Sequence, residues 1–251
     1  MTGVQTCALP ICLALLLAGC VGPKRVTRSA AKVELGAAYY REGNIEGAIE
    51  TLREAARLDP GAWRPWNALA VAYIAKGQNE LAEDAFHQAL RRAPGEAEIL
   101  NNQGTLYLKT GRMDAAVASF KSALDDLDYR NPALIYSNLA YALVLSGKAD
   151  EGLAYAREAT RRAPTMCEAW YHLGLVHEAR KDALAALEAY QQVRQQCPKE
   201  SLGADLRTGC IQVEVGQDDE GIALLQQVLD TVPGTAAADE ARGCLTHRAK
   251  N

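Results

Sequence analysis

The chain has 251 residues, a length that allows either one elongated domain or two compact ones. Helix-forming residues are abundant and aromatic residues make up only 6%, while no alternating run of β-branched residues indicates a sheet. The composition therefore favours an all-α fold. A formal net charge of −4 without a basic stripe argues against nucleic acid as the main partner.

The first twenty residues differ in character from the rest of the chain. Residues 1–11 resemble the in-frame translation of a common sequencing adapter, so we interpret them as an artefact of sequence assembly. Residues 12–19 are apolar, too short to span a membrane, and typical of the remnant of a secretory signal peptide. They end in Leu17-Ala18-Gly19-Cys20, which resembles a bacterial lipobox and predicts lipidation of Cys20. The alternative is a buried leucine-rich helix, which the missing amphipathic spacing disfavours.

Residues 20–28 are predicted to form the lipidated cysteine and a flexible tether, because Gly22, Pro23 and basic residues follow Cys20 directly. By resemblance to lipoproteins in general, Val21 after the cysteine favours the outer membrane over the inner one. Several acyl chains would give stable anchoring. We therefore expect a protein on the periplasmic face of the outer membrane, with covalent lipid on Cys20 and no cofactor.

Residues 63–96 contain two apolar stripes with helical spacing, joined at a glycine. The stripes are Trp66, Leu69 and Tyr73, followed by Ala82, Phe86 and Ala89. Gly77 lies where the chain must turn, and Pro94 ends the second helix. This spacing resembles the tetratricopeptide repeat, a helix-turn-helix unit. One such hairpin cannot bury both of its faces, so the pattern predicts neighbouring repeats.

The same template recurs along the chain and predicts six repeats that stack into an all-α solenoid with one continuous core. The third repeat departs from it through a longer connection at residues 125–131. The sixth is the weakest, because Asp205 and Gln212 take places that prefer aromatic residues. Residues 236–251 are predicted to form a capping helix and tail. The predicted repeats span residues 29–62, 63–96, 97–132, 133–166, 167–200 and 202–235.

No arrangement of residues indicates an enzyme. His172 and His177 are five residues apart, the wrong spacing for two metal ligands on one helical face. Neither a glycine-rich phosphate loop nor a Gly-x-Ser-x-Gly elbow occurs. We therefore predict no catalytic residue, no metal site and no small-molecule substrate.

Four cysteines, Cys167, Cys197, Cys210 and Cys244, lie in the predicted repeats and cap. In an oxidising compartment they allow three full pairings. Cys197 closes the fifth repeat and Cys210 lies in the first helix of the sixth, so we expect a Cys197–Cys210 disulfide. The alternative is four buried free thiols.

The first helices of the repeats are predicted to line a concave groove that is apolar in the centre and polar at its lip. Such a groove suits an extended or helical peptide. The alternative for Val71, Ile74 and Leu108 is that they only pack between neighbouring helices. The predicted groove residues are Asn67, Val71, Ile74, Asn101, Thr105, Leu108, Ser137, Tyr141, Val144, Tyr171 and Leu175.

The third repeat carries the most distinctive pattern: Asn101-Asn102-x-Gly104, then Ala123-Leu124, Tyr129, Pro132 and Asn138. Together with the lipobox and the count of six repeats, it resembles the type IV pilus pilotins, a family of outer-membrane lipoproteins. The resemblance implies that the protein binds secretin subunits, brings them to the outer membrane and promotes their assembly into the ring through which the pilus passes. The Cys197 and Cys210 pair resembles the gliding-motility member of the family.

Two other functions fit the same features. The protein could be a scaffold lipoprotein of a tight-adherence pilus or of another envelope complex, or a regulator of cell-wall synthases. Each would use the same groove on a different protein partner.

Overall fold

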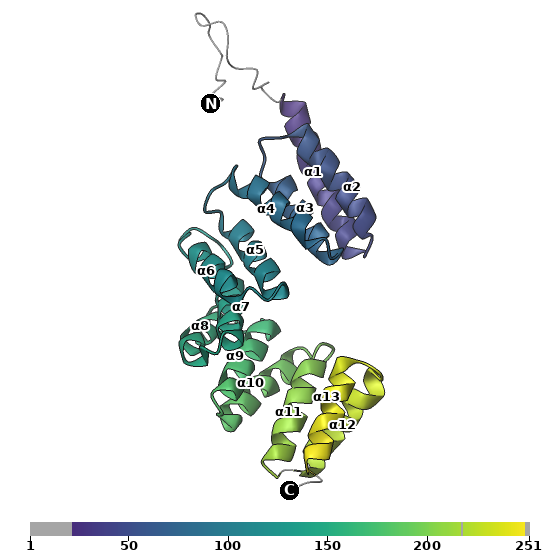
Figure 1. The fold of residues 1–251 in the computed structure, drawn as a ribbon, viewed down its shortest axis with the longest axis vertical. Coiled ribbons are helices and arrows are strands. Elements are labelled where there is room, and N and C mark those ends of the chain that lie inside the picture. The colour runs from purple at the N-terminus through teal and green to yellow at the C-terminus, as the bar shows by residue number, and fades with distance from the viewer. Residues whose placement is uncertain (1–21, 217, 249–251) are drawn as a thin grey trace, which may run out of the picture.

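The computed structural model describes residues 22–216 and 218–248, which form thirteen α-helices and no strand (Figure 1). The predicted adapter segment, the signal-peptide remnant and Cys20 lie outside the described residues. The prediction of an all-α solenoid of hairpin repeats is confirmed. The helices are α1 (Pro23–Arg41), α2 (Ile45–Leu58), α3 (Arg64–Ala75), α4 (Asn79–Leu90), α5 (Ala97–Lys109), α6 (Met113–Ala123), α7 (Pro132–Leu145), α8 (Ala149–Arg162), α9 (Cys167–Ala179), α10 (Ala183–Gln196), α11 (Leu202–Glu214), α12 (Asp218–Thr231) and α13 (Ala236–Arg248).

Each odd-numbered helix from α1 to α11 pairs with the next helix through a tight turn. Gly77, in the turn from α3 to α4, has a φ of 77°, in the left-handed region that favours glycine. Lys181 takes the corresponding place between α9 and α10, with a φ of 61°. The repeat geometry therefore imposes this backbone conformation even where the sequence offers no glycine.

The core lies between the two helices of each hairpin, where a small residue on one helix faces a large residue on the other. Phe86 on α4 and Phe120 on α6 are fully buried. A side chain at Gly104 on α5 would place its Cβ 2.6 Å from the Phe120 ring, so only glycine allows this approach of the two helices. The small and large positions of the sequence template thus correspond to close packing in space.

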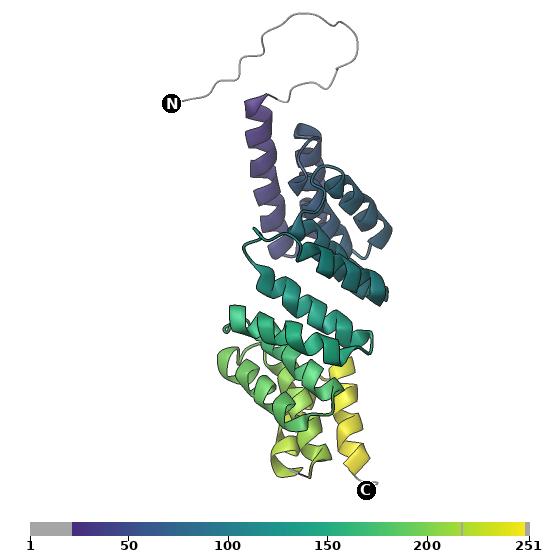
Figure 2. The same ribbon diagram turned by 90° about the vertical axis from the view of Figure 1, so that its left-hand side faces the viewer.

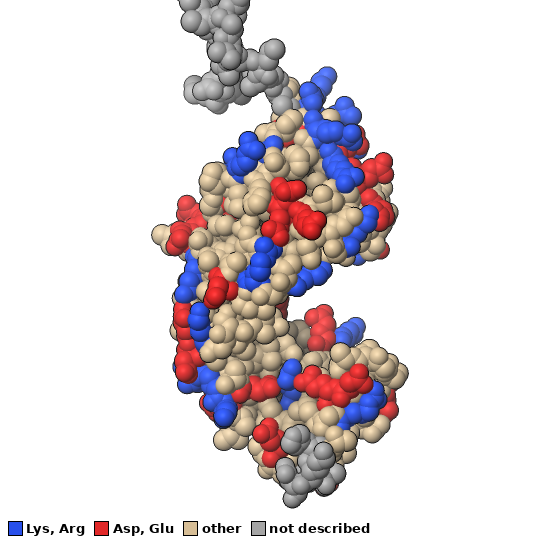
Figure 3. Space-filling model, in the orientation of Figure 1, with Lys and Arg blue, Asp and Glu red and all other residues tan. Residues whose placement is uncertain are grey.

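The hairpins stack into an elongated superhelix whose two ends are α1–α2 and α11–α13 (Figures 1 and 2). The stack is curved, and the space-filling view shows a hollow on one side, between α3 and α11–α13 (Figure 3). Helices α5, α7 and α9 lie nearer this hollow than α6 and α8. The first helices of the repeats therefore face the concave side.

The start of the fold corrects the predicted tether. Residues 23–28 belong to α1, with Pro23 at its first position, where the fixed φ of proline suits a helix and its missing N–H costs nothing. Two contacts hold this part of α1 to α2: the Ser29 hydroxyl donates to the Ala55 carbonyl oxygen at 2.8 Å, and Arg25 Nη2 donates to the Arg57 carbonyl oxygen at 3.2 Å. The glycine-proline sequence starts a helix here instead of loosening the chain.

The predicted Cys197–Cys210 disulfide is wrong. The bonds are Cys167–Cys197, with a Cα–Cα distance of 6.4 Å, and Cys210–Cys244, with 5.3 Å. Cys167 begins α9 and Cys197 caps α10, and an antiparallel hairpin brings those two points to the same end. Cys210 lies within α11 and bonds to α13. The first bond therefore closes the fifth repeat, and the second fastens the capping helix to the sixth.

Candidate interaction surfaces

The structure divides the predicted groove residues into three groups by burial and by packing against the apolar core clusters. Asn67, Asn101 and Ser137 are buried, with at most 4% of each residue exposed, so their prediction as partner-binding residues is wrong. Five others are half-buried and pack against the apolar core clusters: Ile74, Leu108, Val144, Tyr171 and Leu175. Val71, Thr105 and Tyr141 form the third group, because they belong to none of these clusters in the described part of the chain.

The buried polar residues connect the first helices of successive repeats. Asn67 Nδ2 donates to Glu98 Oε1 at 2.8 Å, and Asn102 Nδ2 donates to Asn67 Oδ1 at 3.2 Å, which joins α3 to α5. Asn138 Nδ2 donates to Asn101 Oδ1 at 3.0 Å, which joins α5 to α7. These asparagines use their hydrogen bonds within the stack and set the register between repeats. Burial, together with neighbouring Glu96, raises the pKa of Glu98.

The next connection, from α7 to α9, is made by a histidine. His172 Nδ1 lies 2.8 Å from Ser137 Oγ and 3.1 Å from the Ser137 carbonyl oxygen, and the Tyr141 ring stacks on the imidazole with ring centres 4.7 Å apart. Burial lowers the pKa of His172 to about 4, against the opposing effect of its hydrogen bond to the Ser137 backbone. The imidazole is therefore neutral at pH 7. It serves as a structural link and as a platform for Tyr141.

Val71, Thr105 and Tyr141 are the predicted groove residues that are not buried and pack against none of the apolar core clusters. They lie at the same place in α3, α5 and α7, the ninth position of each repeat. Val71 and Tyr141 are half-buried and Thr105 is exposed. The three side chains therefore form a row along the hollow, apolar at both ends, which suits one amphipathic or extended segment.

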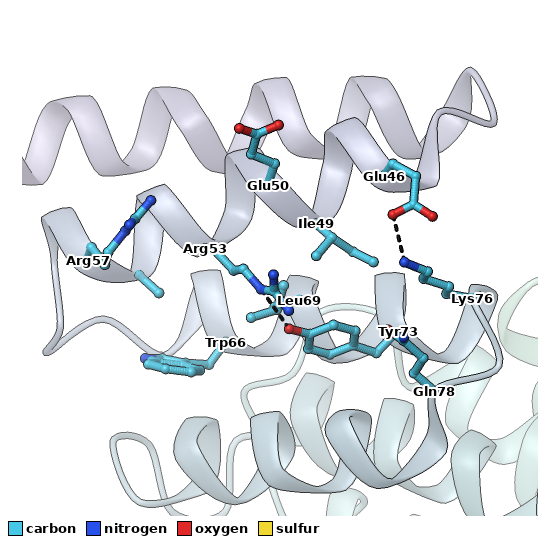
Figure 4. Close-up of a pocket in the computed structure, with 11 residues that line it drawn as sticks. Glu46, Ile49, Glu50, Arg53, Arg57, Trp66, Leu69, Tyr73, Lys76 and Gln78 are labelled. Atoms are coloured by element: carbon cyan, nitrogen blue, oxygen red, sulfur yellow. Dashed lines mark hydrogen bonds and ion pairs between the residues drawn. The ribbon is translucent and has the colours of Figure 1, made fainter.

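A second surface, which the sequence did not predict, is a cleft of about 770 Å³ between α2 and α3 (Figure 4). Apolar side chains from Ile49, Leu69 and Trp66 line it, and Arg53 Nε donates to the Tyr73 hydroxyl at 2.9 Å across it. Trp66 Nε1 is buried and has no hydrogen-bond partner among the described residues. The cleft thus offers apolar contact area, beside a tryptophan whose N–H is unpaired and buried.

The charges of this cleft differ between its two ends. Lys76 Nζ pairs with Glu46 Oε2 at 2.7 Å at one end, whereas Arg57 and Trp66 lie at the other (Figure 4). On the sequence, the α2 residues of the cleft have the spacing of an ordinary solvated helical face. Only the packing of α3 beside them makes a cleft, so no signal within one repeat could have revealed it.

Residues 22–216 and 218–248 contain no group of three or more His, Cys, Asp or Glu side chains that could hold a metal ion. None of the described helices is long and apolar enough to cross a membrane.

Comparisons with known proteins establish the class of protein. The tetratricopeptide repeat model matches residues 67–131 and 137–201, and a second TPR repeat model matches residues 36–77. Because these matches cover more than half of the chain, the protein belongs to the tetratricopeptide-repeat family. Proteins with this fold bind protein partners. A comparison with curated protein sequences found no match.

Several solved structures share the fold of this chain. PilF of Pseudomonas aeruginosa superposes with a TM-score of 0.75 at 22% identity, over 88% of this chain and 99% of its own. PilW, a widely conserved type IV pilus biogenesis factor, gives 0.76 at 22% identity over 84% and 96%. The Cut9–Hcn1 hetero-tetramer gives 0.77 at 16% identity, but over 87% of this chain and 43% of the other. The predicted resemblance is confirmed as a likeness of fold.

Proposed function

We propose that the protein is a pilotin: a lipid-anchored, non-enzymatic protein that binds secretin subunits of a type IV pilus and promotes their assembly at the outer membrane. The observation that carries this proposal is the concave row of Val71, Thr105 and Tyr141, on a superhelix that matches PilF and PilW along nearly their whole length. The match supports the proposal because it extends over 99% of the PilF chain and 96% of the PilW chain.

Val71 and Tyr141 supply the apolar part of the concave row. Burial of apolar surface contributes about 25 cal/mol per Å², while association costs about 4–15 kcal/mol of translational and rotational freedom. Two side chains of this size cannot give tight binding by themselves, so the row suits transient capture of a secretin segment.

The proposed anchor lies at Cys20, outside the described residues. Acyl chains on this cysteine would hold the protein at the membrane where the secretin ring forms. In this scheme the lipid supplies location and the concave face supplies recognition.

The test is secretin assembly in cells that carry the double variant Val71→Ser with Tyr141→Ala. We expect the heat-resistant secretin multimer on an unheated gel to fall at least tenfold, while the circular dichroism spectrum of the purified variant keeps its helical content. A matched control is Leu184→Ser on α10, which removes a 76%-exposed apolar side chain away from the concave row. It should leave the multimer unchanged.

A normal multimer in the double variant would contradict the proposed recognition surface. Failure of the wild-type protein to capture secretin from solubilised membranes would contradict the pilotin function itself. A scaffold of another envelope complex would then be favoured, with its own partner in place of secretin.

A further inference from the structure

The folded body begins almost directly after the predicted lipid attachment site. Helix α1 starts at Pro23, three residues after Cys20. Three residues of extended chain span at most about 11 Å, so the start of α1 cannot lie further than this from the Cys20 Cα. Any membrane that holds a lipid on Cys20 therefore lies beside the end of the molecule where α1 begins.

That end of the molecule is basic, although the whole chain carries a net charge of −4. Lys24, Arg25 and Arg28 are exposed on the first two turns of α1, and the first acidic residue after Cys20 is Glu34. Lys and Arg side chains gather over this end in the space-filling view (Figure 3). We call Lys24, Arg25, Arg28, Arg57 and Arg91 the basic end.

Two hydrogen bonds hold together the helix ends that carry the basic end. Arg25 Nη2 donates to the Arg57 carbonyl oxygen at the end of α2. Arg92, next to Arg91, donates from Nε to the Pro60 carbonyl oxygen at 2.6 Å, which joins the end of α4 to the loop after α2. The start of α1 and the ends of α2 and α4 are thus held together.

The charges of the basic end are not neutralised by the protein. None of its five side chains forms an ion pair with another described residue. The Glu54 carboxylate pairs with Lys32 at 2.7 Å, and that contact is the main reason why its pKa is lowered, with smaller contributions from the charges of Arg57 and Arg28. The surface beside the predicted anchor therefore carries free positive charge.

We propose that the basic end docks on anionic phospholipid headgroups beside the lipid on Cys20. This proposal rests on the proposed lipidation for its geometry. Each Lys or Arg near an anionic membrane surface contributes about 1 kcal/mol. Docking fixes the superhelix upright on the membrane and holds the hollow between α3 and α11–α13 away from the lipid, open to a partner.

The test uses the full chain with Cys20→Ser, which removes the acylation site, and vesicles of phosphatidylcholine with or without phosphatidylglycerol. The apolar residues 12–19 partition into both kinds of vesicle, so the measured quantity is the ratio of the two partition coefficients in a sedimentation assay. We expect the protein to prefer anionic vesicles at low salt and to lose this preference at high salt, because salt screens surface charge.

The variant Lys24→Gln, Arg25→Gln, Arg28→Gln should lower partitioning into anionic vesicles by about a hundredfold, which corresponds to about 1 kcal/mol for each charge. The matched control neutralises three exposed cations remote from α1 that also lack ion pairs: Arg130→Gln, Arg157→Gln, Lys199→Gln. It should bind as the Cys20→Ser parent does. Circular dichroism verifies that both variants stay folded.

Equal binding of the parent to neutral and anionic vesicles would overturn the proposal, and so would an equal loss in the control variant. Secretin capture by the same Cys20→Ser protein is measured separately. If vesicle selectivity fails while capture persists, the membrane-docking surface is wrong and the pilotin function stands. If selectivity is found without capture, membrane docking is supported and the pilotin function fails.

Discussion

The N-terminal and C-terminal parts of the superhelix are held together in different ways. In α3–α6 the core contains Phe86 and Phe120, both fully buried, and the small residues that face them. In the sixth repeat Leu225 takes the place of these phenylalanines and is also fully buried. The difference lies in the first helix, where α11 places the buried polar residues Asp205, Thr208 and Gln212 at the positions that hold Trp66, Leu69 and Tyr73 in α3. Both disulfides lie in this C-terminal part, between α9 and α13.

The polar residues of α11 show why the C-terminal part needs more than packing. Asp205 is satisfied by Arg194 Nε at 2.8 Å and by the Ser201 hydroxyl at 2.7 Å. Thr208 Oγ1 and Gln212 Oε1 have no hydrogen-bond partner among the described residues, and a buried unpaired polar atom costs about 1–3 kcal/mol. The comparison teaches that covalent bonds stabilise the repeats whose sequence contributes least apolar burial.

The largest effect is expected when Cys167, Cys197, Cys210 and Cys244 are all changed to alanine, which removes both disulfides. This variant tests the difference between the two parts directly. Each bond closes a loop of about 30 residues and contributes about 3.7 kcal/mol in the chain-entropy model, so the total loss is about 7 kcal/mol if the two add. Hydrogen exchange should show opening confined to α9–α13, because each repeat contacts only its neighbours. Equal loss of protection in α1–α4 would contradict the comparison.

A smaller effect is expected from the N-terminal part, where no crosslink is present among the described residues. Phe86→Ala leaves a cavity in the second repeat and should lower the free energy of unfolding by about 3–5 kcal/mol, measured by urea denaturation. Leu81→Ala on the same helix is the control: Leu81 is 41% exposed, so its truncation should change stability by no more than about 0.5 kcal/mol. If the two variants were equally stable, packing would not be what holds this part.

The smallest effect concerns the junction between the two parts, where His172 links α9 to α7. Its folded pKa of about 4 lies below the ordinary value of 6.5, so the unfolded state binds the proton first. The stability contributed by the neutral ring is complete above pH 6.5 and is lost as the pH falls toward 4, by about 3 kcal/mol in all.

The measurement for His172 is the free energy of unfolding at pH 7 and at pH 5 for the wild type and for His172→Phe. The substituted ring can still stack on Tyr141 but cannot take up a proton. We expect the variant to lose less stability between the two pH values than the wild type does. An identical pH dependence in the two proteins would show that His172 does not titrate in this range.

The sequence by itself determined the helical hairpins and their order. Apolar spacing, turn glycines and terminal prolines act within about 34 residues, and interactions over so short a stretch of chain fix local structure. Trp66, Leu69, Tyr73 and Phe86 were assigned correctly to one hairpin because the template needs only helical periodicity. The number of repeats followed from the same template.

Only the tertiary structure decided how the hairpins meet. The buried asparagines, the cleft between α2 and α3 and the Cys210–Cys244 bond all depend on contacts between different repeats or with the cap, which helical periodicity does not encode. Cys167–Cys197 could have been found from the antiparallel hairpin alone, because its two residues lie at the same end. The other features required the rotation of each repeat against the next, which is set by the packing of many side chains at once.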